Sequence, residues 1–262
     1  PARGGLPATI ARRGADGGWR LSGHKTYSTG IPALSWLAVW ARTDEDAPRV
    51  GMFLVPRDAG GIRVVETWDH LGLRASCSHD VLFDDVALPG DHAVDVRLPA
   101  DWAPIDGSPA ARELAAQTAW MVVLLGSLYD AVARSAATWL KDFLRSRVPA
   151  SLGKPLASLP RMQEAVGQIE ALLWANRILL DQAAAGVDAG QGPGLVESGL
   201  LKHQVTGNAI AVVEHALQLT GNHGLSRRNP LERHHRDVLC SRIHTPQNDV
   251  ILASAGRAAL GL

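Results

Sequence analysis

The sequence predicts an α+β fold in two parts: an antiparallel β-barrel or sandwich over residues 1–98, then an antiparallel four-helix bundle over residues 99–262. Short apolar runs separated by Gly, Pro and Asp fill the first part, which is typical of strands. After Ser108 the apolar residues recur every three or four positions, which is the period of a helix. Hydrophobic residues make up 46% of the chain and charged residues 20%, a globular balance that argues against disorder.

The β-rich part contains five predicted strands. A hairpin turn is expected at Ala15–Gly18, because Asp-Gly and Gly-Gly steps suit tight turns. The predicted strands are Trp19–Ser22, Leu37–Ala41, Val50–Val55, Ile62–Val65 and Val81–Val86.

The helical part begins at a recognisable cap. Ser108 is a plausible N-cap with Pro109 in the first turn, and no helix breaker follows before Pro149. We expect a second helix from about residue 158 to 186, a third from 195 to 220 that ends at Gly221, and a fourth from residue 246 onward. Long helices with short connections favour an antiparallel bundle.

Composition excludes several classes of function. The formal net charge is +0, so no overall field attracts nucleic acid or an anionic membrane. The longest apolar stretch, Ala119–Tyr129, is shorter than the roughly 20 residues of a membrane span. Two cysteines, Cys77 and Cys240, cannot form a disulfide framework, which indicates a cytoplasmic protein. No HExxH or CxxC spacing exists, so no metal site is expected.

Three stretches together resemble the acyl-CoA dehydrogenase superfamily. They are Gly18–Gly30, then Leu71–Ser76 continuing through Val81–Pro89, and finally Ala216–Gln218 with Gly221–Gly224 and Glu232–Asp237. The resemblance covers essentially the whole chain but about the last two thirds of a typical member. The family's N-terminal helical domain is therefore expected to be absent, either cut away or supplied by another polypeptide.

The resemblance implies a flavin cofactor, FAD or in one branch reduced FMN. It assigns Tyr27, Ser28 and Thr29 to the isoalloxazine, with the Tyr27 ring stacked on it and the Thr29 hydroxyl near N5. Without the resemblance, these residues would be interpreted as an aromatic side chain of a strand followed by hydroxyl side chains of a turn. The β-rich part and the bundle are expected to close around the ring.

The resemblance also assigns residues to the rest of the cofactor. Arg145, Arg147 and Gln163 would contact the pyrophosphate or adenine across a dimer interface, because guanidinium suits phosphate. Alternatively, the two arginines have no cofactor role and only place favourable positive charge at a helix C-terminus. Further cofactor candidates are the turn that contains Gln218, Gly221 and Gly224, and the separate residue Gln247. An ordinary helix cap explains Gly221 equally well.

Arg74 and Ser76 are the candidates for substrate binding. In the family this stretch approaches the flavin and the thioester end of an acyl-CoA. The alternative is a structural arginine that pairs with Asp80, Asp84 or Asp85.

The catalytic base of the dehydrogenases is missing. The family's usual glutamate aligns with Thr245, and its other known position aligns with Ala119; neither residue accepts a proton at neutral pH. Asp249 or Glu113 could substitute only from a turn or more away. Alternatively, the step His244–Gln247 resembles the flavin monooxygenases of this superfamily, in which a histidine hydrogen-bonds the flavin C4a-(hydro)peroxide. A histidine that satisfies backbone carbonyls at a helix end is the structural alternative.

Three functional hypotheses follow. The first is an acyl-CoA dehydrogenase-like oxidoreductase that transfers hydride to flavin N5 from a small organic substrate, with His244, Thr245 and Asp249 as catalytic candidates. The second is a reduced-flavin-dependent monooxygenase that uses His244. The third is a non-catalytic or half-site subunit that needs a partner chain. The resemblance implies a homotetramer, a dimer of dimers.

Overall fold

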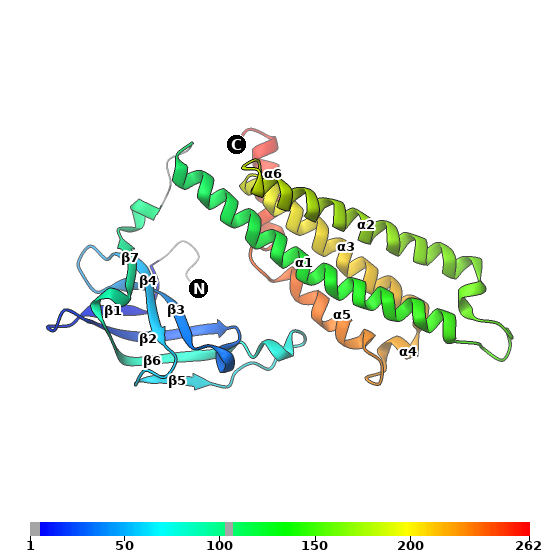
Figure 1. Cartoon of the computed structure of the whole chain (residues 1–262), viewed down its shortest axis with the longest axis horizontal. Coiled ribbons are helices and arrows are strands. Elements are labelled where there is room, and N and C mark those ends of the chain that lie inside the picture. Colours follow the sequence, from blue (N-terminus) through cyan, green and yellow to red (C-terminus); the bar gives the residue numbers. More distant parts are fainter. Residues whose placement is uncertain (1–5, 103–106) are drawn as a thin grey trace. The chain divides into compact units, whose positions relative to one another are not determined.

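The computed structural model describes residues 6–102 and 107–262. Residues 1–5 of the predicted β-domain and 103–106 of the predicted helical domain lie outside the described residues. The described chain forms two compact units, one of strands and one of helices (Figure 1). Leu71–Leu73 belong to the helical unit, although they lie between strands in the sequence. The predicted two-part fold is confirmed.

The strand unit is one sheet of seven strands in the order β5-β6-β2-β1-β3-β4-β7. All five predicted strands are present, and β1 and β7 were missed because their short segments contain charged residues that interrupt the apolar pattern. The strands are β1 (Ile10–Arg13), β2 (Trp19–Ser28), β3 (Trp36–Thr43), β4 (Val50–Pro56), β5 (Ile62–Val65), β6 (His79–Leu88) and β7 (Ala93–Arg97).

One strand pair departs from the antiparallel expectation. β1 pairs with β2 in an antiparallel hairpin, but on its other side β1 runs parallel to β3, with Ile10 opposite Arg42. The sheet is therefore mixed. The predicted hairpin turn is confirmed: Gly14 N–H donates to the Gly18 carbonyl at 2.9 Å, and Gly17 has a φ of 81°.

One hydrophobic cluster supports the sheet. Strand side chains alternate in direction, so every second residue of β3 and β4 faces this core. Trp19 and Phe53 meet edge to face with ring centroids 5.3 Å apart. The buried position of Trp19 anchors the start of β2, whose far end carries the predicted flavin residues.

The helical unit contains six α-helices among its described residues. They are α1 (Pro109–Ser146), α2 (Pro160–Asp188), α3 (Leu195–Thr220), α4 (Asn222–Leu225), α5 (Leu231–Leu239) and α6 (Asn248–Ala259). Ser108 caps α1 as predicted, because its Oγ accepts from Ala111 N–H at 3.1 Å. The short helices α4 and α5 were missed, since α5 is mostly charged residues and histidines.

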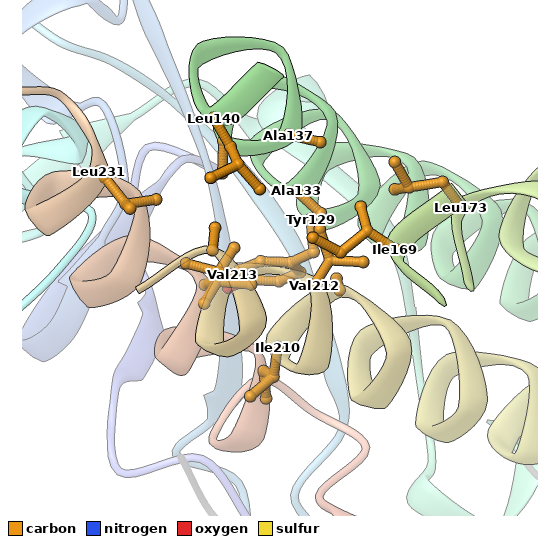
Figure 2. Close-up of a cluster of buried hydrophobic side chains, with 14 of the residues drawn as sticks. Tyr129, Ala133, Ala137, Leu140, Ile169, Leu173, Ile210, Val212, Val213 and Leu231 are labelled. Carbon is orange, nitrogen blue, oxygen red and sulfur yellow. The ribbon is translucent and has the colours of Figure 1, made fainter. Parts of the chain in front are cut away.

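Four helices share the main core. Side chains of α1, α2, α3 and α5 form one buried cluster that includes Tyr129, Leu140, Ile169, Val213 and Leu231 (Figure 2). Tyr129, Leu140 and Leu231 are 0% exposed. This core fixes the position of the Tyr129 hydroxyl.

A buried polar network also joins the three long helices. Asn176 Nδ2 of α2 donates to Asp130 Oδ1 of α1 at 3.0 Å, and Asn208 Nδ2 of α3 donates to Asn176 Oδ1 at 2.8 Å. Arg134 pairs with Asp130 at 2.5 Å. Since buried polar groups without partners are costly, this network selects one register of the helices.

Among the described helices, α1 alone is long and apolar enough to cross a membrane by length and composition. The core helix of a globular protein passes the same test, and α1 packs along α2 and α3.

Candidate functional site

The end of β2 presents an exposed aromatic cluster. Tyr27 is 60% exposed and has a φ of 56°, a left-handed backbone that costs a non-glycine residue about 1–2 kcal/mol. Its ring lies edge-on to Trp68 and His70, with centroids 6.3 and 6.0 Å away, and Trp68 stacks on His70 at 3.7 Å. A strained backbone that keeps an aromatic ring in solvent is a mark of a functional position.

Three hydroxyls run in series beside this cluster. Thr29 Oγ1 lies 2.9 Å from Ser78 Oγ, and Ser78 Oγ lies 2.8 Å from Ser76 Oγ. The Gly30 N–H donates to the Ser76 carbonyl at 2.8 Å. The structure therefore brings together Thr29, predicted to contact flavin, and Ser76, predicted to contact substrate. The sequence analysis did not predict Ser78, which links them. The available signal was that Ser78 lies two residues after Ser76, just before β6 begins.

A pocket of about 330 Å³ opens among the same residues of the strand unit. Its lining includes Tyr27, Thr29, Trp36 and Phe83. Lys25 also lines it and donates from Nζ to the Trp40 carbonyl at 2.5 Å, and burial lowers the pKa of its ammonium group. Aromatic and aliphatic walls with hydroxyls and a single cation match a planar heteroaromatic ring with polar edges.

Arg74 is exposed, and the alternative structural pairing is not observed for it. Asp80 accepts from His24 at 2.7 Å and from Thr67 at 3.0 Å, and Asp85 pairs with Arg20 at 3.3 Å. Within residues 6–102 and 107–262, no carboxylate lies within 4.0 Å of the Arg74 guanidinium.

The residues just before Arg74 are held by α5. Leu73 N–H donates to Asp237 Oδ1 at 2.7 Å, and Arg236 donates to the Leu71 carbonyl at 2.8 Å. A Cβ on Gly72 would lie 2.2 Å from the Arg236 carbonyl oxygen, so only glycine allows this approach. Two segments that are far apart in the sequence, Leu71–Leu73 and Arg236–Asp237, thus belong to one structural unit.

A second pocket, of about 260 Å³, lies among α1, α2 and the short segment that joins them. Arg145 and Gln163 both line it, over an apolar floor that includes Leu144 and Met162. A guanidinium and an amide beside an apolar surface fit a phosphate and an adenine. Arg147 caps the end of α1 and does not line this pocket.

The predicted glycine turn has local explanations. Gly221, with a φ of 52°, closes α3. A Cβ on Gly224 would lie 2.4 Å from Thr220 Oγ1, so tight packing of α4 on α3 requires this glycine. Gln218 is exposed on α3. These observations account for both glycines without a phosphate, and the cofactor role of the turn stays a prediction.

His244 is held by a buried phenol. Tyr129 Oη lies 2.6 Å from His244 Nδ1, and Tyr129 is 0% exposed. Among the described residues, His244 Nδ1 is the hydrogen-bond partner of the Tyr129 hydroxyl. A buried phenol needs an acceptor for its proton, so Tyr129 donates to Nδ1. Nδ1 is then an acceptor, and the proton of the neutral imidazole is on Nε2.

Electrostatics support this protonation state. Burial, with the charges of Cys240 and Asp237, raises the pKa of Tyr129, so the phenol keeps its proton. Burial and the cation of Lys202 lower the pKa of His244, so the imidazole is neutral at pH 7. The site can offer an N–H donor that carries no charge. Sequence reasoning missed Tyr129, because an aromatic at helical spacing is usually a core residue.

The other catalytic candidates offer no buried base. Thr245 and Asp249 are exposed, on either side of the start of α6, and Gln247 is its N-cap. Ala119 is 0% exposed within α1. Glu113 is exposed and accepts from Gln117 at 3.1 Å.

Models of known families match both units. The model of the acyl-CoA dehydrogenase middle domain matches residues 5–86, and that of the acyl-CoA dehydrogenase C-terminal domain matches residues 111–260.

Individual relatives agree. The protein YdbM of Bacillus subtilis (strain 168) is 33% identical over 96% of this chain and 63% of its own length. The amino sugar nitrososynthase DnmZ of Streptomyces peucetius is 29% identical over 92% of this chain and 58% of its own length. The chain thus spans about 60% of the length of these relatives.

Solved structures show the same fold. KijD3 in complex with FMN and a dTDP-linked amino keto sugar has a TM-score of 0.81 and 28% identity, covering 99% of this chain and 63% of that one. Butyryl-CoA dehydrogenase from Megasphaera elsdenii has a TM-score of 0.78 and 24% identity, covering 96% of this chain and 63% of that one. The chain belongs to the acyl-CoA dehydrogenase family, whose flavin-dependent members include both acyl-CoA dehydrogenases and nitrososynthases.

Proposed function

We propose that the chain forms the middle and C-terminal parts of a reduced-flavin-dependent oxygenase that acts on a small organic substrate. One observation carries the proposal: Tyr129 Oη lies 2.6 Å from His244 Nδ1, which leaves the imidazole proton on Nε2, one residue before Thr245, the position that the resemblance gives to the dehydrogenase glutamate. Reduced flavin, when bound, supplies the electrons that activate molecular oxygen.

The residues at the expected base positions support oxygenation over dehydrogenation. Acyl-CoA dehydrogenation needs a base for the α-proton, and neither the Thr245 hydroxyl nor the Ala119 methyl group can act as one at neutral pH. An oxygenase needs no such base. A neutral N–H donor suits it better than a carboxylate, because the donor stabilises an oxygen that gains negative charge.

The described residues have complementary roles in this proposal. Tyr27 would cover the flavin ring, Thr29 would donate from its hydroxyl to the ring edge, and Arg145 with Gln163 would hold phosphate or adenine. Exposed Arg74 would hold an anionic part of the substrate. The relatives that carry nitrososynthase in their names and the FMN complex of KijD3 favour oxygen transfer and reduced FMN or FAD.

The test compares two reactions of the purified protein. The oxygenase is expected to keep its oxidised flavin unbleached when mixed anaerobically with acyl-CoAs, and to incorporate label from ¹⁸O₂ into substrate when given reduced flavin. Amino sugar nucleotides are the first substrates to try, and straight-chain acyl-CoAs are the comparison. Bleaching by any acyl-CoA would overturn the proposal.

Variants sharpen this test. His244→Phe keeps an aromatic ring and removes the N–H donor, so about one hydrogen bond, worth about 1–1.5 kcal/mol, is lost. The fraction of reduced flavin coupled to product is then expected to fall about tenfold, with hydrogen peroxide released instead. His234→Phe is the control, because His234 is another partly buried histidine, on α5.

Assembly and cofactor identity are part of the same proposal. We expect a homotetramer, measured by light scattering. The flavin released from the protein is expected to be FAD if it stays bound through catalysis, and FMN if reduced flavin is delivered for each turnover. Chromatography of the released flavin distinguishes the two.

A further inference from the structure

Lys202 is a fully buried lysine in the middle of α3. It is 0% exposed, and among the described residues no carboxylate lies within 4.0 Å of its ammonium group. Burying a charge without a counter-ion is expensive, and a desolvated titratable group of this kind is a candidate functional position. The proposed oxygenation gives Lys202 no role.

The two hydrogen bonds of Lys202 reach both ends of one turn. Its Nζ donates to the Ser241 carbonyl at 2.8 Å and to Asn248 Oδ1 at 3.3 Å. Ser241 lies at the end of the α5 region and Asn248 begins α6. The turn between them, residues 241–248, contains His244 and is therefore tied at both ends to α3.

Tyr129 ties the middle of the same turn to α1. Its hydroxyl bonds His244 Nδ1 at 2.6 Å. A turn of eight residues thus has three hydrogen bonds to two core helices, and both side chains that make them, Lys202 and Tyr129, are buried. His244 Nε2 has no recorded partner in the described chain and is not among its buried unsatisfied atoms, so this nitrogen is available to a ligand.

We propose that Lys202 and Tyr129 are positioning residues that clamp the turn 241–248 and present His244 as a neutral Nε2–H donor. The catalytic meaning of this clamp rests on the function proposed above. The clamp itself is a property of the folded protein and can be measured without flavin.

The charged and titratable groups around His244 agree with the clamp. Tyr129 faces it from α1 and Lys202 from α3, while Asp237 and Cys240 act on the Tyr129 phenol. Asp249 of α6 is exposed. Arg242, within the turn, is exposed and lies 3.8 Å from Glu214. Burial lowers the pKa of His244, and the Lys202 cation lowers it further.

The experiment is a ¹⁵N NMR titration of the protein with labelled histidines, and His244→Gln assigns the signal. In the unsubstituted protein, Nδ1 is expected to show the shift of an acceptor and Nε2 that of a protonated nitrogen near pH 7. Tyr129→Phe is expected to let the tautomer with the proton on Nδ1 appear beside the one with the proton on Nε2. Lys202→Met is expected to raise the pKa of His244. Lys141→Met is the matched control, because Lys141 forms a surface ion pair with Glu170 at 2.9 Å.

Asn248→Ala covers the case in which Lys202→Met does not fold. It removes one acceptor and keeps the charge, so the amides of residues 243–245 and 247 are expected to exchange faster while the pKa of His244 stays low. If Tyr129→Phe keeps the tautomer and Asn248→Ala keeps the exchange rates, the clamp is refuted. If the NMR results are as expected but no ¹⁸O enters any substrate, the proposed function fails and the clamp stands.

Discussion

Gly72→Ala tests the contact between the Leu71–Leu73 segment and α5. The added methyl group would lie 2.2 Å from the Arg236 carbonyl oxygen and 2.9 Å from Cys240 Sγ. Both distances are far below van der Waals contact, and a backbone carbonyl in a helix cannot move aside. The segment must therefore leave α5.

The cost follows from the hydrogen bonds that are lost. Leu73 N–H to Asp237 and Arg236 to the Leu71 carbonyl each involve a charged partner, and such bonds contribute about 1.5–3 kcal/mol each. Since the freed groups regain water, we expect a net loss of about 3 kcal/mol, the lower end of the sum. Opening of this segment then becomes on the order of 100-fold more frequent.

Hydrogen exchange of the Leu73 amide measures this opening directly. Gly60→Ala is the matched control, because a Cβ there meets nothing within 4 Å and its backbone φ is in the ordinary range. The control is expected to change exchange at Leu73 less than threefold. If the two variants exchange alike at Leu73, the close approach at Gly72 is not what holds the segment.

Three further predictions concern stability and cofactor binding. The pKa of His244 is lowered in the folded protein, so the unfolded chain takes up that proton first as the pH falls. The free energy of unfolding therefore decreases below about pH 6.5. In urea titrations at several pH values, His244→Gln is expected to make this decrease smaller. Asp130→Ala leaves one buried amide hydrogen of Asn176 without an acceptor and is expected to cost about 1–3 kcal/mol of unfolding free energy. Ser78→Ala breaks the series between Thr29 and Ser76, and fluorescence titration is expected to show flavin binding weakened about tenfold.

Each of these has an outcome that contradicts it. If the free energy of unfolding falls equally steeply with pH in His244→Gln and in the unsubstituted protein, His244 is not the group responsible. Glu170→Ala, which removes an exposed surface partner of Lys141, is expected to cost less than about 1 kcal/mol; an equal loss in Asp130→Ala would show that burial adds nothing. Unchanged flavin affinity in Ser78→Ala would show that the hydroxyl series does not support the cofactor.

Local signals in the sequence determined the parts of the fold that were predicted. The bounds of α3, Leu195–Thr220, were predicted because Gly221 ends a long periodic segment. Ser108 marked the start of α1 for the same kind of reason. β1 and β7 were missed because a short strand that includes arginines or aspartates shows little apolar alternation.

The site was less accessible to sequence reasoning, since its contacts join distant residues. Lys202 interrupts a buried stripe of α3 that includes Ser198, Val205 and Ala209, and this interruption was the available signal. A lysine is normally read as a surface residue. No local pattern indicates that Tyr129 bonds His244 across 115 positions.

The helical half of this protein is not a continuous stretch of chain. Three residues encoded among the strands, Leu71–Leu73, are part of it. A gene split or a recombination crossover between the two halves would leave α5 without these residues, with the Asp237 carboxylate and the Arg236 guanidinium deprived of their backbone partners. The two halves are therefore expected to be inherited, exchanged and engineered as a pair, and homologues that carry one half alone should differ in sequence at Gly72 or at Arg236–Asp237.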